Sequence, residues 1–183
     1  VGSNGAVTVT DLLTGVTTLV DQNIGYRRLD GIAWSPWNTL LFAEETGGGR
    51  VFEWDPRTRT TATRTAVGLR PHEGMRFDSQ GNLYGISETT PGSTGSGAVF
   101  KFVPDRKGDL SRGQLYALKV TAASRTGAAT WVPLDRDLVR INSDSAATLA
   151  GATGWGRPED VEIVPAWLEL GGPVEDAWTA VAE

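Results

Sequence analysis

Residues 30–46 read DGIAWSPWNTLLFAEET, and residues 73–89 read EGMRFDSQGNLYGISET. The second stretch repeats the pattern of the first at a distance of 43 residues, from the acid–glycine pair at its start to the Glu-Thr pair at its end. In each copy, two apolar runs flank a short segment rich in Ser, Pro, Asn, Asp or Gly, which is typical of a tight turn between antiparallel strands. The repeat therefore predicts two paired strands in each copy and indicates an array of similar units.

A third strand is expected after each copy. Residues 49–55 (GRVFEWD) and 97–104 (GAVFKFVP) resemble each other, and residues 5–11 (GAVTVTD) have the same pattern. Segments in which apolar and polar residues alternate follow each of them, as expected for half-buried outer strands. These outer strands are predicted at residues 15–20, 60–67 and 114–120.

Short strands that recur every 43 or 44 residues indicate an all-β fold, and specifically a β-propeller of four-stranded blades. A β-sandwich, whose strands are also short and closely spaced, is the alternative. The constant offset favours the propeller. Too few strands are present to close a ring, so we expect an incomplete propeller of about three blades' worth of strands, closed by further blades or by another chain.

The domain prediction is one propeller portion over residues 1–183. Its parts are a partial blade at 5–21, blades at 30–67 and 73–120, an irregular insertion with a short helix at 121–156, and a partial blade at 159–183.

The composition restricts the class of protein. The chain has 22 acidic and 17 basic residues, mixed along the sequence, which argues against nucleic-acid binding because such proteins carry a basic surface. The sequence has no run of 18 apolar residues, so no membrane span is predicted, and the first ten residues lack the pattern of a signal peptide. The chain has no cysteine, which excludes disulfides, thiolate metal ligands and thiol catalysis.

Acidic residues recur at the start of each predicted inner strand. Asp30, Glu73 and Glu159 hold this place, and Glu44 and Glu45 end the second strand of the first copy. The inner strands of a propeller line its channel and ligands collect at its mouth, so we expect these carboxylates at one rim. Neighbouring carboxylates shift one another's pKa or bind a cation, and Ca²⁺ prefers oxygen ligands.

Arginines near these acids allow an alternative in which each carboxylate only forms a salt bridge, with Arg70, Arg76 or Arg157. Arg157 also carries a fork of donors suited to phosphate, and Pro158 is expected to hold it in extended backbone. The single histidine, His72, is expected to be structural or to orient a ligand from outside the coordination shell, and one histidine makes a Ser-His-Asp hydrolase improbable.

Several segments resemble PhoX-type alkaline phosphatases. Residues 37–45 (WNTLLFAEE) resemble the Trp-x-Thr-Trp-Leu-Thr-Cys-Glu-Glu segment of that family, and residues 71–74 (PHEG) resemble its Phe-x-His-Glu segment. Residues 97–105 (GAVFKFVPD) are similar to its Gly-x-Ile-Tyr-Lys-Phe-Val-Pro segment, and residues 157–160 match its Arg-Pro-Glu-Asp motif. The resemblance covers residues 30–164. Two further segments that fit are residues 113–119 and 131–134.

The resemblance implies a six-bladed propeller phosphatase, exported to the periplasm or outside the cell, which removes phosphate from phosphorylated small molecules. It also implies a calcium and iron cluster at the channel mouth. Carried over by position, Glu44 or Glu45, Glu73 and Glu159 would be metal ligands, and Arg157 would hold the substrate phosphate. Arg157 and Glu159 would then be the catalytic residues. Residues expected to support them from outside the coordination shell are His72 and Asp160.

One position departs from the family pattern. The family places a Cys directly before the paired glutamates, and this chain has Ala43 there. Ca²⁺ is therefore the expected cofactor, whereas Fe³⁺ is in doubt because it benefits from the missing thiolate. Three functions stay open: a metal-dependent phosphomonoesterase, a non-catalytic calcium-binding or structural propeller, and a calcium-dependent lactonase or esterase.

Overall fold

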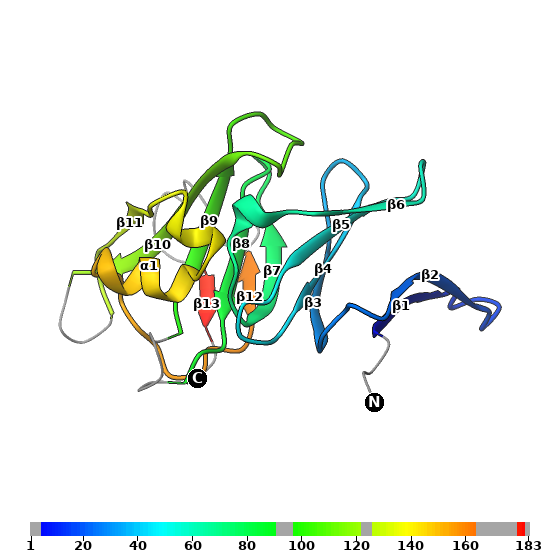
Figure 1. Ribbon diagram of the computed structural model, residues 1–183, viewed down its shortest axis with the longest axis horizontal. Helices are drawn as coiled ribbons and strands as arrows, with labels where there is room; N and C mark the ends of the chain where they lie inside the picture. Colours follow the sequence, from blue (N-terminus) through cyan, green and yellow to red (C-terminus); the bar gives the residue numbers. More distant parts are fainter. Residues whose placement is uncertain (1–4, 91–96, 122–125, 164–178, 182–183) are drawn as a thin grey trace.

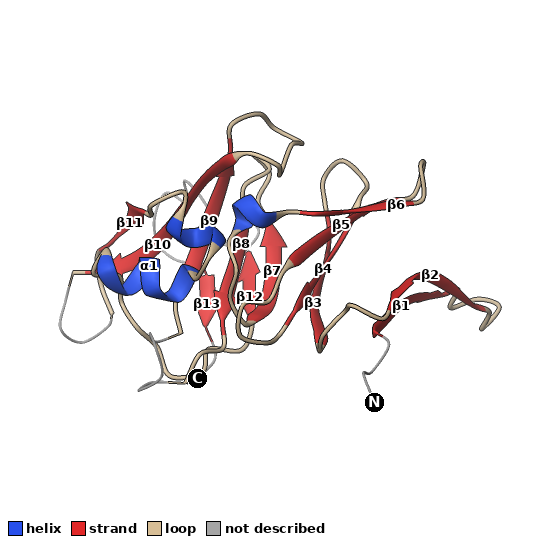
Figure 2. Ribbon diagram, viewed as in Figure 1, coloured by secondary structure: helices blue, strands red, loops and turns tan. Residues whose placement is uncertain are grey.

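The computed structural model describes residues 5–90, 97–121, 126–163 and 179–181. The chain is mostly β, with antiparallel sheets joined by loops and short helical segments (Figure 1, Figure 2). Its elements are β1 (Gly5–Thr10), β2 (Thr17–Asn23), β3 (Leu29–Trp34), β4 (Leu40–Glu44), β5 (Val51–Asp55), β6 (Thr60–Thr63), the 3₁₀ turn η1 (Thr65–Val67), β7 (His72–Phe77), β8 (Leu83–Ser87), β9 (Val99–Pro104), β10 (Gly113–Val120), β11 (Ala129–Pro133), the 3₁₀ turn η2 (Leu138–Arg140), α1 (Ser143–Leu149), β12 (Val161–Ile163) and β13 (Thr179–Val181).

The first repeat forms a four-stranded sheet in the order β3-β4-β5-β6. The predicted turn between β3 and β4 is present: Ser35 N donates to Thr39 O at 2.9 Å, and Asn38 takes a positive φ of 64°. Asn is among the residues that tolerate this left-handed backbone best. Antiparallel pairing continues through the whole sheet, so the strands expected from the repeat are confirmed here.

The predicted outer strand at residues 60–67 is shorter than expected. β6 ends at Thr63, and Thr65–Val67 form the turn η1 instead. Ala66 and Val67 are buried in the main apolar core, so the chain leaves the sheet edge in order to bury them.

The second repeat forms a five-stranded sheet in the order β7-β8-β9-β10-β11. The fifth strand, β11, was not predicted, because residues 121–156 were expected to hold only loops and a short helix. Trp131 pairs with Leu118 of β10, and its ring packs edge-on against Tyr84, with the ring centroids 5.8 Å apart. This aromatic contact across the sheet gives β11 a reason to join its edge. The expected short helix is present as α1.

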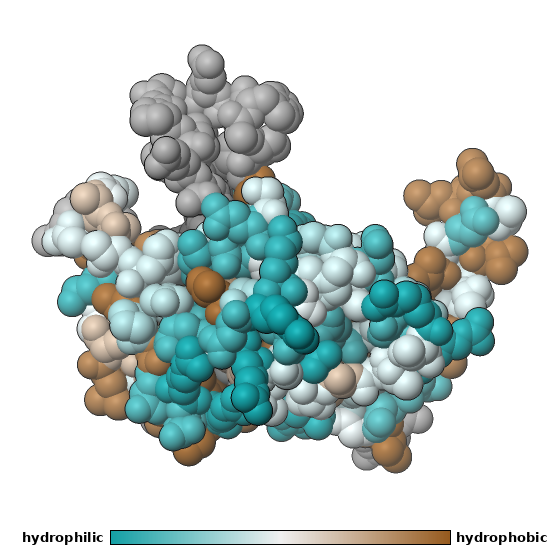
Figure 3. Space-filling view, turned by 90° about the horizontal axis from the view of Figure 1, so that it is seen from above, coloured by the Kyte–Doolittle hydropathy of each residue, from teal (hydrophilic) through white to brown (hydrophobic). Residues whose placement is uncertain are grey.

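Two-stranded sheets lie at either end of the chain. β1 pairs with β2, and β12 pairs with β13, as the strand pattern predicted. Of the last predicted strand, Trp178 and residues 182–183 lie outside the described residues. The β1–β2 hairpin extends from the body of the molecule, and apolar side chains gather at its end, where Leu12 and Leu13 are more than 90% exposed (Figure 1, Figure 3).

The strands β3, β7 and β12, which hold the places of the predicted inner strands and are called the inner strands, lie side by side, and glycines allow their close approach (Figure 1). A Cβ atom on Gly31 would lie 2.2 Å from the backbone oxygen of Glu73, and a Cβ on Gly74 would lie 2.7 Å from the backbone nitrogen of Val161. Gly31 and Gly74 hold the same place in the repeat. Each of the two repeats therefore supplies a glycine that lets its inner strand pack closely against the next one.

The main core lies between the two larger sheets. Apolar side chains of β4, β5, β9 and β10 are fully buried there, and Ala146 and Ala147 of α1 pack against them. Burial of this kind is the principal stabilising contribution to the fold and holds the ends of the inner strands in fixed positions. No helix within the described ranges has both the length and the apolar character of a membrane span.

Candidate metal centre

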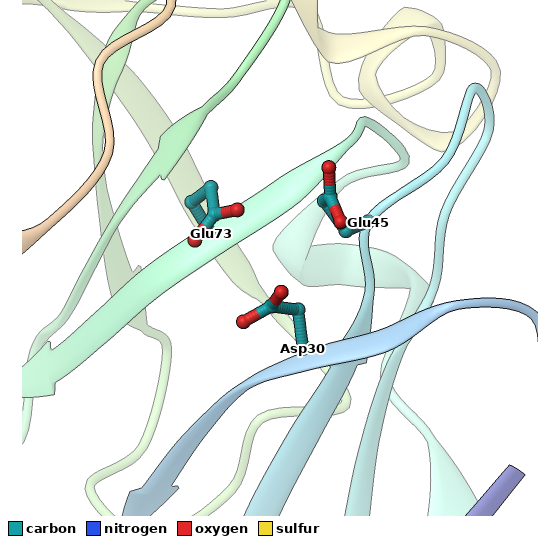
Figure 4. Close-up of side chains that lie close together, drawn as sticks. All are labelled: Asp30, Glu45 and Glu73. Carbon is teal, nitrogen blue, oxygen red and sulfur yellow. The ribbon is translucent and has the colours of Figure 1, made fainter.

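Three carboxylates from separate parts of the first two repeats meet at one end of the inner strands. Asp30 belongs to β3, Glu73 to β7, and Glu45 directly follows β4. Each offers an oxygen, and these oxygens all lie within 4.8 Å of one another. Figure 4 shows the three side chains directed into the space between their strands. The sequence prediction that acids of successive repeats converge is therefore met for this group.

Glu88 is a fourth acid of this centre, and the sequence analysis did not name it as a site residue. It directly follows β8, and its side chain is 8% exposed. Glu88 hydrogen-bonds to Glu45 and contributes charge near Glu73. Glu88 lies 43 residues after Glu45, at the same place in the repeat, so the repeat itself carried the signal that could have identified it.

The electrostatics of the centre favour proton or cation binding. Partial burial, together with the charges of Asp30, Glu45, Glu88 and Glu159, raises the pKa of Glu73 to about 7. The hydrogen bond with Glu88 raises the pKa of Glu45, and the same bond lowers the pKa of Glu88. Neighbouring carboxylates repel each other when both are charged, and a proton or a cation between them would relieve this repulsion.

Two arginines border the centre. Arg28 donates to both carboxylate oxygens of Glu45 at 2.7 Å, and Arg157 forms an ion pair with Glu88. The expectation that Pro158 keeps Arg157 extended is wrong, because Arg157 has a φ of 51°, in the left-handed region. Its guanidinium lies between Glu88 and Glu159 and is 58% exposed, so ion pairs on both sides accompany this unusual backbone.

Glu159 lies at the margin of the centre. Arg157 donates to its carboxylate at 3.5 Å, and its backbone oxygen accepts from Gly74 N at 3.3 Å. Its charge contributes to the raised pKa of Glu73, although about half of its side chain is exposed. The salt-bridge alternative therefore applies to Glu159. Of the other arginines considered, Arg76 pairs with Glu162.

Glu44 does not join the centre, and the structure corrects its assignment as a metal ligand. Its fully buried carboxylate accepts from the backbone N–H and the guanidinium of both Arg27 and Arg50, at 2.7–3.2 Å. Burial raises its pKa, but the bonds from Arg50 and Arg27 outweigh this and hold the pKa at about 2. Successive side chains of a strand point to opposite faces, so Glu44 and Glu45 cannot both face one site.

His72 takes a structural place. His72 is fully buried, its Nε2 lies 3.1 Å from Gly68 O, and burial followed by the charge of Arg70 lowers its pKa. Its imidazole is therefore neutral and does not reach the acids, which corrects the expectation that it orients a ligand there. The side chain of Asp160 is exposed and lies beside Gly74.

The donor set suits a hard cation. Asp30, Glu45, Glu73 and Glu88 offer only carboxylate oxygens, which are the ligands that Ca²⁺ takes. Ala43 is fully buried in the apolar core and offers no ligand atom, so the residues present do not supply the thiolate that the resemblance implies for iron. These residues therefore fit calcium, but they do not fit an iron site that requires a thiolate ligand.

Comparison with known proteins identifies the family. The family model described as alkaline phosphatase PhoX matches residues 43–171, which include Glu45, Glu73, Glu88, Arg157 and Glu159. No curated protein sequence matches the chain significantly. The model covers more than half of the chain and spans most of the acidic centre, so the chain belongs to the PhoX alkaline phosphatase family.

Proposed function

We propose that this chain is part of a calcium-dependent phosphomonoesterase of the PhoX type, with its metal site at the acidic centre. The observation that carries the proposal is the convergence of Asp30, Glu45 and Glu73 within 4.8 Å, in a chain that belongs to an alkaline phosphatase family. Phosphate esters are anionic, and a bare cluster of carboxylates would repel them. Phosphate chemistry at this place therefore requires a cation between protein and substrate.

Asp30, Glu45, Glu73 and Glu88 would hold Ca²⁺, with Glu159 beside them. Bound calcium would supply Lewis-acid stabilisation of the charge on the phosphoryl oxygens. The carboxylates would have to be deprotonated to hold the cation, which the pKa of about 7 for Glu73 allows at alkaline pH. An alkaline pH optimum is the consequence expected for this site.

Arg157 would bind the substrate phosphate. Its guanidinium is exposed beside the acids and offers a planar fork of N–H donors, which matches phosphate oxygens. Glu88 and Glu159 hold it in the absence of substrate. If Glu88 turned to a bound cation, its ion pair with Arg157 would weaken and the guanidinium would be available for the anionic substrate.

The proposed architecture is a β-propeller whose inner strands are β3, β7 and β12. The support is their side-by-side arrangement, the meander order of both larger sheets, and the gathering of acids at one end of these strands. An apolar groove of about 450 Å³ lies at the opposite end and is lined by residues that include Ile32, Trp34 and Phe77. Ile32 and Trp34 are half exposed, which fits strands that further blades or another chain would cover. Location in the periplasm or outside the cell is proposed from the family alone.

The test is phosphate release from p-nitrophenyl phosphate by protein that has been stripped with a chelator and then reloaded. The proposal expects activity with added Ca²⁺, loss of activity after chelation, and loss in Glu73→Gln. A matched control is Glu162→Gln, which changes an exposed acid of β12 that pairs with Arg76. If the protein binds calcium but releases no phosphate with any added divalent metal or with ferric iron, the catalytic proposal is overturned.

A second candidate is a non-catalytic calcium-binding or structural module. Ala43 favours it, because the family pattern has a thiolate ligand at this position and this chain does not. This candidate expects calcium to raise the thermal unfolding temperature of the protein while no phosphate ester or lactone is hydrolysed. Hydrolysis of a lactone but not of a phosphate ester would instead support the third candidate, an esterase or lactonase.

A further inference from the structure

Glu45 and Glu88 hold equivalent places in the two repeats, and their backbones are held in the same way. Glu45 N donates to Arg28 O at 2.8 Å, and Glu88 N donates to Pro71 O at 3.2 Å. Arg28 and Pro71 are themselves 43 residues apart. The two repeats differ, however, in the side chains that fix the residues next to each glutamate.

In the first repeat, the preceding residue fixes the strand end. The carboxylate of Glu44 is buried and accepts hydrogen bonds from the backbone and side chains of Arg27 and Arg50. This buried carboxylate joins the end of β4 to the segments on both sides of it. Glu45, the next residue, therefore leaves the strand from a fixed point.

In the second repeat, the equivalent of Glu44 is Ser87, which has no carboxylate. Asp144 of helix α1 supplies one instead: its Oδ2 accepts from Ser87 Oγ at 2.8 Å and from Thr89 Oγ1 at 2.5 Å. Ser87 and Thr89 are the two neighbours of Glu88 in the chain. One carboxylate oxygen thus ties down both sides of the residue that reaches the acidic centre.

The charged partner is repeated as well. Arg27, which pairs with Glu44, lies 43 residues before Arg70. Burial raises the pKa of Asp144, and the hydrogen bonds from Thr89 and Ser87 and then the charge of Arg70 oppose this rise. Asp144 is only 3% exposed, and its Oδ1 has no hydrogen-bond partner among the described residues. A carboxylate is costly to bury, and a small apolar residue would fill the same place at lower cost. The acceptor function of Asp144 is what requires it there.

We infer that Asp144 is a positioning residue for Glu88. Asp144 has the role in the second repeat that Glu44 has for Glu45 in the first. The insertion that interrupts the repeats thereby becomes part of the acidic centre, acting through the two hydroxyl groups of Ser87 and Thr89. The anchoring stands on the contacts alone. Its effect on calcium binding rests on the proposed function.

Hydrogen exchange of calcium-free protein tests the anchoring directly. Asp144→Ala removes the acceptor, whereas Asp144→Asn loses the charge but keeps one acceptor oxygen for both hydroxyls. We expect the Glu88 amide to exchange at least about tenfold faster in Asp144→Ala than in wild type, and close to the wild-type rate in Asp144→Asn. Asp137→Asn, an exposed acid in the same insertion, is the matched control. Unchanged exchange in Asp144→Ala would overturn the inference.

Calcium titration by calorimetry tests the consequence. Residues that support metal ligands cost about 10- to 100-fold in affinity when they are changed, so Asp144→Ala is expected to weaken calcium binding at least tenfold relative to Asp144→Asn. Equal weakening in both variants would show an effect of charge and would overturn the positioning role. Wild-type protein that binds no calcium would refute the proposed function, while the exchange result would still decide the inference.

Thr89→Val provides a second test in case Asp144→Ala does not fold. It removes one of the two hydroxyls, keeps the shape of the side chain and leaves Asp144 in place. Faster exchange at Glu88 and weaker calcium binding in Thr89→Val support the inference, and wild-type behaviour in both measurements contradicts it.

Discussion

Arg28 and Arg157 both have left-handed backbone, with φ values of 42° and 51°, and each pairs with one of the two equivalent glutamates of the acidic centre. Glu45 receives Arg28, and Glu88 receives Arg157. Left-handed backbone is unfavourable for a residue with a long side chain, at about 1 kcal/mol or more. Two such residues at one site indicate that the guanidinium groups are placed there at a cost in stability, as is common at functional sites.

Arg157→Ala is expected to lower kcat/KM for phosphate esters by about 100-fold, because the donor fork that would bind the developing phosphoryl charge is lost. Arg157→Lys should retain part of the activity, since it keeps the charge without the fork. Steady-state kinetics with p-nitrophenyl phosphate measure both. Arg136→Ala, which breaks an exposed ion pair with Asp105, serves as control. Equal activity in wild type and Arg157→Ala would remove Arg157 from the phosphate site.

The stability of calcium-free protein should fall as the pH rises from 5 to 8. Glu73 has a pKa of about 7 in the folded chain and about 4.5 in the unfolded chain, so the folded state binds more protons within this interval. Allowing for partial exposure, the loss in the free energy of unfolding is about 1–2 kcal/mol. Urea unfolding at several pH values measures it. Glu73→Gln should reduce this slope, while the raised pKa of Glu45 leaves a smaller slope of the same sign, and a Glu73→Gln slope equal to that of wild type would contradict the assignment.

Glu44→Gln should destabilise the protein by about 3–5 kcal/mol, because it leaves Arg27 and Arg50 without their buried partner. The low pKa of Glu44 has a second consequence with a definite sign. The stability that it contributes is complete above pH 4.5 and is lost as the pH falls toward 2. Chemical unfolding at neutral and acid pH measures both effects. Asp55→Asn, which removes a surface pair with Arg57, should leave the stability close to that of wild type.

Gly31→Ala and Gly74→Ala should each destabilise the fold by about 1–3 kcal/mol, because the new methyl group would collide with the backbone of the neighbouring inner strand. Gly47→Ala is the control, since nothing lies within 4 Å of a Cβ at that position. Thermal unfolding compares the three variants. If Gly31→Ala and Gly47→Ala unfold at the same temperature, the inner strands are not in the contact described.

The repeat allowed much of this structure to be predicted from sequence. Strands with alternating side chains, turns with Asn38 or Gly81, and acids at equivalent places all follow from local rules that hold within one repeat. The convergence of Asp30 and Glu73 follows from the same 43-residue offset, since equivalent residues of neighbouring repeats lie near one another.

Some errors were avoidable from the sequence, and the others have tertiary causes. The alternation of side chains along a strand indicates different directions for Glu44 and Glu45, and the 43-residue offset from Glu45 identifies Glu88 as a site residue. The strand β11 and the left-handed backbone of Arg157 depend on tertiary contacts, with Tyr84 in one case and with Glu88 in the other. No local pattern in the sequence encodes such contacts.

Asp160 directly precedes β12, at the position that Gly31 and Gly74 hold in the first two repeats. A bare α-carbon lets two backbones meet, whereas Asp160 carries a side chain, and its Oδ1 lies 3.1 Å from the place that a Cβ of Gly74 would take. The glycine that allows close backbone approach is therefore present in the first two repeats and absent from the third.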